Sequence, residues 1–272
     1  MNENRQTNGS CHAAPLSALL IDAPVGRHFA QLHRRSETLT GAVGQFVETG
    51  LRRGNGVVVI ASALHTEEVF DRLAEQRIDV GSFLRCGQLV VRDAQAMLDT
   101  IMRGGRPDEG AFRRAIASVL ESVHAFGRPA PRAYGEMVNL LWRAGQTAAA
   151  LRLEGFWNEL ARLYPFGLFC GYMLDSRDAS IHAGRLHEIG RTLGDVVTAP
   201  HDQCFRDALN QASHDVFGLS PRRLVGLPSP VPPESHLPPT DQRTMLWMMR
   251  QAPASSAEVL EQGRVQYQQR FN

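Results

Sequence analysis

The feature that most constrains the fold of this chain is a regular alternation of short apolar runs with amphipathic stretches between about residues 17 and 195. The run Val57–Ala61 is continuous and β-branched, which is typical of a strand covered on both faces of a parallel sheet. The predicted fold is therefore an α/β three-layer sandwich around a mostly parallel sheet. The other strand candidates are Ala18–Ile21, Phe29–Leu32, Gln88–Val91, Arg132–Tyr134 and Phe166–Met173, the last of which we expect to be the final strand.

Helical spacing marks the segments between these strands. Ser36 is expected to cap the helix that follows the first strand. The clearest helix is Thr147–Leu163, because its apolar residues recur at three- and four-residue intervals and form one buried face. That face consists of Ala149, Leu153, Phe156, Leu160 and Leu163.

The character of the chain changes near residue 196, and seven prolines lie between residues 220 and 239. Such a density of proline prevents regular helices and central strands and is typical of a semi-rigid linker. Helical patterns at His201–Val216 and Ala257–Arg270 flank this segment. The predicted organisation is a disordered N-terminus (1–15), an α/β domain (16–195), a helical extension (196–218), a Pro-rich linker (219–240) and a helical tail (241–272).

Composition excludes several classes of function. The 29 basic and 28 acidic residues give a formal net charge of +1, so the overall basic footprint of a nucleic-acid-binding protein is missing. We find neither a signal-peptide pattern nor an apolar run near 18 residues, which predicts a cytoplasmic protein without a membrane span. The four cysteines lie far apart and form no C-x-x-C pair. For Cys170, in an apolar strand, an inert core thiol is favoured over a redox sensor.

The sequence contains no lysine, and all its basic residues are therefore arginines. This excludes a P-loop lysine and Schiff-base chemistry. The first strand-to-helix turn, His33–Thr38, has no glycine to wrap a phosphate; Arg34 and Arg35 there are interpreted as a solvated turn rather than an anion site. His187-Glu188 is followed by Arg191 where a zinc protease needs its second histidine. We expect no catalysis, no cofactor and no metal site.

Polar residues inside core-like segments are the remaining candidates for a binding site. His28 and Gln31 bracket the first strand, Glu136 follows a later strand with Trp142 beyond it, and Asn158 lies beside the stripe of the long helix. Ligands of open α/β sheets gather at the carboxyl ends of strands, so Gln31 and Glu136 are expected to face one crevice. The alternative is that these groups cap helices or bond loop backbone. The predicted ligand-binding set is His28, Gln31, Arg34, Arg35, Glu136, Trp142 and Asn158.

The same segments resemble the MEDS family, named after the sensory domain of a dichloromethane-responsive regulator of methylotrophs. The resemblance rests on the order of His28-x-x-Gln31, 50–54 (GLRRG), 87–90 (GQLV), 135–142 (GEMVNLLW) and 153–160 (LEGFWNEL), and covers about residues 16–193. It implies a fold similar to RecA/KaiC-type ATPases whose phosphate loop has been lost. It also implies a sensory role, sometimes proposed for hydrocarbon derivatives, in proteins attached to regulators or kinases.

Together these observations predict a non-catalytic sensory domain that binds a small ligand or a regulatory partner and signals through its C-terminal tail. A kinase, an anti-sigma-type protein or a transcriptional regulator is the expected partner class. One alternative is a pure protein–protein adaptor, and another is a residual nucleotide binder that uses Arg34, Arg35 and Glu136. The expected partner-binding surface of the tail is Met245, Trp247, Met248 and Met249 around Leu246.

Overall fold

The computed structural model describes residues 20–33, 35–124, 128–173, 195–198, 200–218 and 253–271. Its centre is a six-stranded sheet in the order β3-β2-β6-β7-β1-β8, and every neighbouring pair of strands is parallel. A separate two-residue hairpin pairs β4 (Met102–Arg103) with β5 (Arg106–Pro107). The six strands of the main sheet are β1 (His28–His33), β2 (Val57–Ala61), β3 (Leu89–Asp93), β6 (Arg132–Gly135), β7 (Gly167–Met173) and β8 (Asp195–Thr198).

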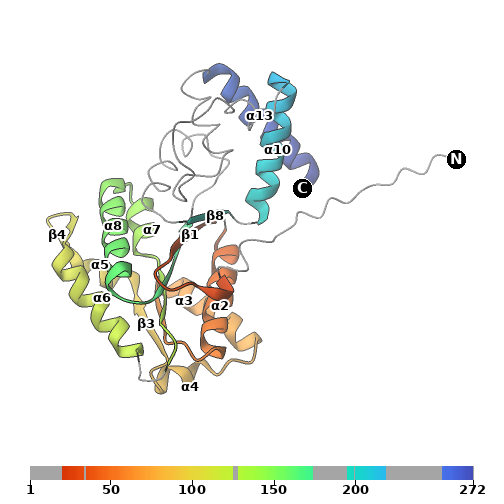
Figure 1. Ribbon diagram of the computed structural model, residues 1–272. Coiled ribbons are helices and arrows are strands. Elements are labelled where there is room, and N and C mark those ends of the chain that lie inside the picture. The colour runs from red at the N-terminus through yellow and green to blue at the C-terminus, as the bar shows by residue number, and fades with distance from the viewer. Residues whose placement is uncertain are drawn as a thin grey trace.

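Helices cover both faces of this sheet, so the predicted three-layer sandwich is confirmed (Figure 1). One face is covered by α2 (Ser36–Arg52), α3 (Ala63–Glu75) and α4 (Val80–Arg85). The other face is covered by α5 (Ala94–Ile101), α6 (Glu109–Val123), α7 (Met137–Arg143) and α8 (Thr147–Leu163).

Successive side chains of each strand point to opposite faces of the sheet, and this divides the interior into two cores. In β2, Val57 and Val59 belong to the core under α2 and α3, whereas Val58 and Ile60 belong to the core under α5–α8. All five residues of β2 are buried, because neighbouring strands and both helical layers enclose them. The continuous β-branched run therefore marks a fully enclosed strand, as its sequence predicts.

Two further helices, α10 (Pro200–Phe217) and α13 (Pro253–Phe271), lie side by side beyond the β8 edge of the sheet (Figure 1). Both helices are predicted by the sequence, with bounds differing by a few residues. Leu209 of α10 is buried, and a Cβ added at Gly263 of α13 would lie only 2.7 Å from its Cδ2. The Gln266 side chain of α13 also donates a hydrogen bond to Asp215 of α10 at 2.9 Å.

Three local predictions are wrong. Leu20 and Ile21 of the candidate strand Ala18–Ile21 are helical, and their backbone carbonyls accept hydrogen bonds from the side chain of Arg132 instead of pairing in the sheet. Ser36 begins α2 rather than capping it, because Arg35 occupies the N-cap position and the Ser36 hydroxyl donates to Glu68. Phe166–Met173 is followed by another strand, β8, whose four residues are too short a run to stand out in the sequence.

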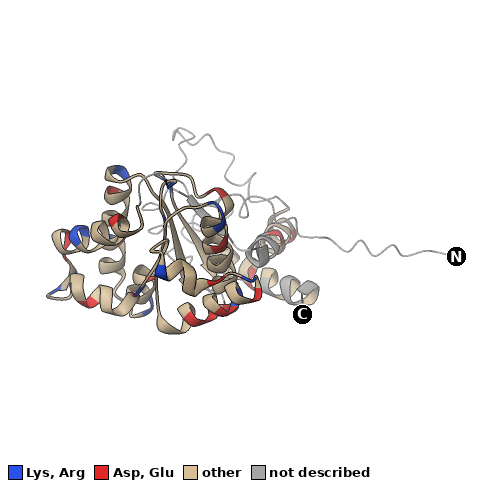
Figure 2. Cartoon of the chain, turned by 90° about the horizontal axis from the view of Figure 1, so that it is seen from below, with Lys and Arg blue, Asp and Glu red and all other residues tan. Residues whose placement is uncertain are grey.

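Figure 2 shows acidic and basic positions interspersed over the helices on both sides of the sheet. Within the described residues, no helix combines the length and the apolar character needed to cross a bilayer. The predicted N-terminal segment 1–15 and the Pro-rich linker 219–240 lie outside the described residues, and the predicted domain limits stay predictions.

Candidate functional site

The carboxyl ends of β1, β2, β6 and β7 meet at one edge of the sheet, where several polar side chains gather. His33 is the last residue of β1, Ser62 follows β2, and Glu136 follows β6. We call Gln31, His33, His65, Tyr134 and Glu136 the edge cluster.

Glu136 is the best-connected member of the edge cluster. Its carboxylate accepts a hydrogen bond from the Ser62 backbone N–H at 2.7 Å and contacts the Nδ1 of His65 at the start of α3. The bond with Glu136 raises the pKa of His65 above its ordinary value, against an opposing effect of burial. Glu136 therefore fixes the beginning of α3 to the end of β6 and favours the protonated form of His65.

The other members of the edge cluster carry hydrogen-bonding atoms that the described part of the chain leaves unused. These are Oε1 of Gln31, both ring nitrogens of His33 and the hydroxyl of Tyr134, all of them buried. Burial, with the nearby charge of His65, lowers the pKa of His33 to about 3, so its ring is neutral at pH 7. Most buried polar groups in proteins have a partner, so four such atoms in one cluster are unusual.

Gly171 of β7 makes room for this arrangement. It lies beside Gln31 in the sheet register. A Cβ at position 171 would lie 2.3 Å from Cδ1 of Leu39 and 2.9 Å from the hydroxyl oxygen of Tyr134. The missing side chain therefore lets Tyr134 and Leu39 approach β7 closely, next to the unused amide oxygen of Gln31.

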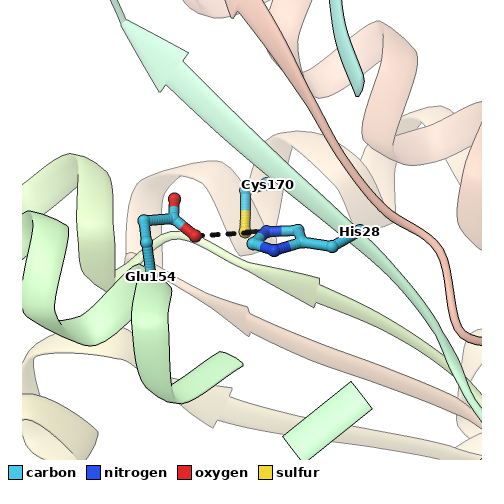
Figure 3. A group of neighbouring side chains, drawn as sticks. All are labelled: His28, Glu154 and Cys170. Atoms are coloured by element: carbon cyan, nitrogen blue, oxygen red, sulfur yellow. Dashed lines mark hydrogen bonds and ion pairs between the residues drawn. The ribbon is translucent and has the colours of Figure 1, made fainter. Parts of the chain in front are cut away.

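A second set of polar residues is buried on the opposite face of the sheet, beneath α8 (Figure 3). Nε2 of His28 lies 3.2 Å from Sγ of Cys170 and 3.2 Å from Oε2 of Glu154. On the outer side of this group, Nδ1 of His28 is 2.8 Å from Oδ1 of Asn158, and the hydroxyl of Tyr172 donates to Oε1 of Glu154. We call these five residues the interior cluster.

Burial keeps the ionisable members of the interior cluster uncharged at neutral pH. It lowers the pKa of His28 to about 4 and raises the pKa of Glu154 to about 8. The pKa values of Cys170 and Tyr172 are raised well above their ordinary range for the same reason. The contact between His28 and Glu154 is consequently one between a neutral ring and a carboxylic acid rather than an ion pair.

The structure brings together only part of the predicted ligand-binding set. His28 and Asn158 are in contact, but His28 and Gln31 lie on opposite faces of the sheet because they are three residues apart in β1. Glu136 follows β6 directly, whereas Gln31 is the fourth of the six residues of β1, and the crevice that they were expected to share stays a prediction. Trp142 is buried, with its ring edge-on to Tyr172 at 6.1 Å between centroids.

Among the remaining predicted residues, the structure describes only Arg35. Arg35 is exposed at the N-cap of α2 and makes no side-chain capping bond. Arg34 and the predicted partner-binding residues Met245, Trp247, Met248 and Met249 lie outside the described residues.

Six residues of the two clusters, His33, His65, Tyr134, Glu154, Cys170 and Tyr172, were not in the predicted ligand-binding set. Glu154 could have been added, because it lies four residues before Asn158 and so shares its helix face. Cys170 and Tyr172 lie two apart in a strand and so share a sheet face. For the contacts of His65 and His33 the sequence carries no comparable signal, because their neighbours are distant in the chain.

The fold and the edge cluster define an α/β domain with an open parallel sheet and polar groups where such sheets bind ligands. The family model described as "MEDS: MEthanogen/methylotroph, DcmR Sensory domain" matches residues 27–188, which is more than half of the chain. The chain belongs to the MEDS family, which confirms the resemblance found in the sequence and places the chain in a family of sensory domains. A search of curated proteins found no match.

Proposed function

We propose that this protein is a non-catalytic cytoplasmic sensor that binds a small molecule at the edge cluster. The observation that carries the proposal is the set of four buried, unused hydrogen-bonding atoms on Gln31, His33 and Tyr134. Leaving such atoms without a partner costs about 1–3 kcal/mol each, and a ligand that pairs with them recovers part of that cost. The membership of a sensory family supports the same role.

The chemistry of the cluster favours a small uncharged ligand with both donor and acceptor groups. His33 is neutral, and the carboxylate of Glu136 is already opposed by His65. The aromatic rings of Phe29 and Phe169, stacked at 5.2 Å between centroids, lie on the same face of the sheet and provide apolar surroundings. An alcohol, amide or carbonyl group on a compact apolar body matches these properties.

The short connection between β1 and α2 argues against a nucleotide-binding site. Only residues 34 and 35 separate the end of β1 from the start of α2, so the connection is too short to wrap a phosphate with successive backbone N–H groups. It contains no glycine, and the chain has no lysine to contact a phosphate. A phosphate loop of the ATPase type is therefore not part of the proposal.

A continuous series of elements connects the edge cluster with the C-terminal helices. β1, which carries Gln31 and His33, pairs with β8, where Gln31 faces Val197 in the register. β8 leads toward α10, and α10 is in contact with α13. We propose that ligand binding changes how firmly α13 stays on α10, which requires different ligand affinities for the two states.

Native mass spectrometry of the full chain purified from its own host tests the proposal. We expect a bound small molecule in the wild type and its loss in His33→Leu and Glu136→Gln, with His214→Leu as an exposed-histidine control. Equal occupancy in all four proteins, or no small molecule in the wild type, contradicts it. A co-purifying protein without a small molecule favours the adaptor alternative instead.

A further inference from the structure

Three metal-ligating atoms of different types converge inside the interior cluster (Figure 3). Nε2 of His28, a carboxylate oxygen of Glu154 and Sγ of Cys170 all lie within 4.8 Å of one another, and all three residues are buried. They come from β1, at the start of the sheet, and from the consecutive elements α8 and β7, which lie more than 100 positions later in the sequence. The convergence therefore depends on the tertiary fold and not on a local motif.

In His28 and Glu154, the nitrogen and oxygen that point away from the three converging atoms already form hydrogen bonds with other residues. Nδ1 of His28 is bonded to Asn158, and Oε1 of Glu154 accepts from the hydroxyl of Tyr172. Oε2 of Glu154, in contrast, has no hydrogen-bond partner within the described chain although it is buried. Outer partners that orient a histidine and a carboxylate, with the opposite atoms facing each other, are the usual surroundings of protein metal sites.

We propose that His28, Glu154 and Cys170 form a buried binding site for a divalent transition-metal ion of the zinc type. Nitrogen, oxygen and sulfur are the donors that zinc accepts, and three protein ligands are typical of zinc sites that leave a fourth position open. Around a tetrahedral ion bound at about 2.0–2.3 Å, ligand atoms are separated by roughly 3.3–3.8 Å. The two separations from Nε2 of His28 are 3.2 Å and need a small expansion, and the third, between the Glu154 oxygen and Sγ of Cys170, is at most 4.8 Å.

The charge balance of such a site suits the apolar core. A dication with one thiolate, one carboxylate and one neutral imidazole carries no net charge, which avoids the cost of a buried unpaired ion. Binding forms three bonds from the ion to sulfur, oxygen and nitrogen, and the thiol and carboxyl protons pass to solvent. No oxidant or reductant is involved, and the ion keeps its +2 state.

The best test uses a chain in which Cys170 is the only thiol, made by Cys11→Ser, Cys86→Ser and Cys204→Ser substitutions. Because the ligands are buried, this full-length protein is unfolded in urea in the presence of a chelator, which removes any bound metal. It is then refolded with Co²⁺. We expect one Co²⁺ per chain, the visible bands of tetrahedral cobalt and a thiolate-to-cobalt charge-transfer band, all of which added Zn²⁺ abolishes. The charge-transfer band reports Cys170 specifically, whichever of the ten histidines also binds Co²⁺.

A matched variant keeps the exposed Cys86 as the only thiol and carries Cys170→Ser in addition to Cys11→Ser and Cys204→Ser. It should show no thiolate band, and Asn158→Ala in the Cys170-only chain should weaken the affinity by roughly 10–100-fold. A Cys170-only chain that refolds with native circular dichroism but shows no thiolate band overturns the proposal. An equal band from the Cys86-only chain overturns it as well. If the Cys86-only chain does not fold, the band of the Cys170-only chain decides alone.

Discussion

The two polar clusters lie on opposite faces of one sheet and differ in how completely their hydrogen bonds are formed. In the interior cluster, His28, Glu154 and Tyr172 bond to one another or to neighbours, and one carboxylate oxygen is left over. In the edge cluster, Glu136 is paired but Gln31, His33 and Tyr134 leave four atoms unused. We therefore expect the interior cluster to stabilise the fold, and we expect the unused atoms of the edge cluster to lower the stability of the ligand-free protein.

The largest expected effect is that of Glu154→Ala. It leaves a cavity beneath α8 and removes the acceptor of the Tyr172 hydroxyl, so we expect a loss of about 2–4 kcal/mol in the free energy of unfolding. Urea unfolding at pH 7 of protein freed of metal by a chelator measures this loss. Glu159→Ala, on the exposed side of α8, is the control. A loss no larger than that of the control shows that the interior cluster does not stabilise the fold.

Glu136→Gln should have an intermediate effect that depends on pH. The amide oxygen still accepts from Ser62, but the bond to a charged His65 is weakened, so we expect a loss of about 1–2 kcal/mol near pH 6. The folded pKa of His65 lies above 6.5, so its contribution is complete below pH 6.5 and is lost as pH rises through the folded value. Urea unfolding at pH 6 and pH 9 should therefore show a smaller deficit at pH 9.

His33→Leu should change the free energy of unfolding in the opposite direction to Glu154→Ala, because it should not destabilise the ligand-free protein at pH 7. Removing two unused buried nitrogens is expected to leave the free energy of unfolding unchanged or raise it by about 1 kcal/mol. A clear loss at pH 7 would show that the His33 nitrogens are bonded, and the edge cluster would then resemble the interior one. Urea unfolding of the ligand-free protein decides between these outcomes.

The same variant should change the acid sensitivity of the protein. The folded pKa of His33 is about 3 and the unfolded value about 6.5, so only the unfolded chain takes up the proton between these pH values. This ring therefore lowers the stability of the wild type as pH falls below 6.5, by on the order of 1 kcal/mol per pH unit, and His33→Leu removes that loss. Unfolding curves at pH 7 and pH 5 compare the two proteins, and a constant difference between them contradicts the expectation.

The smallest expected effect concerns two helical glycines, one beside the interior cluster on α8 and one between α10 and α13. Gly155→Ala on α8 meets no atom within 4 Å and should stabilise the protein by about 0.5–1 kcal/mol. Gly263→Ala on α13 places its Cβ 2.7 Å from Leu209 and should give less gain or a loss, because α10 and α13 must separate slightly. Thermal unfolding of both variants measures this, and equal gains would show that the two helices are loosely packed.

The sequence alone determined the α/β fold class, most of the strands and helices, and the family. The β-branched run of β2 and the stripe of α8 reflect local periodicity, which follows directly from which faces of a strand or helix are buried. That Glu136 and Gln31 face one crevice is a prediction from the rule for strand ends. Local patterns of this kind need no knowledge of which strands are neighbours.

Only the tertiary structure decided which polar residues meet. The strand order places β7 beside β1, and this brings Cys170 to His28 across 142 positions of the sequence. His28 and Gln31, which the predicted binding set had grouped together, face different cores because they lie three residues apart in one strand. The physical reason is that contacts between distant segments depend on strand order, which the spacing of residues along the chain does not encode.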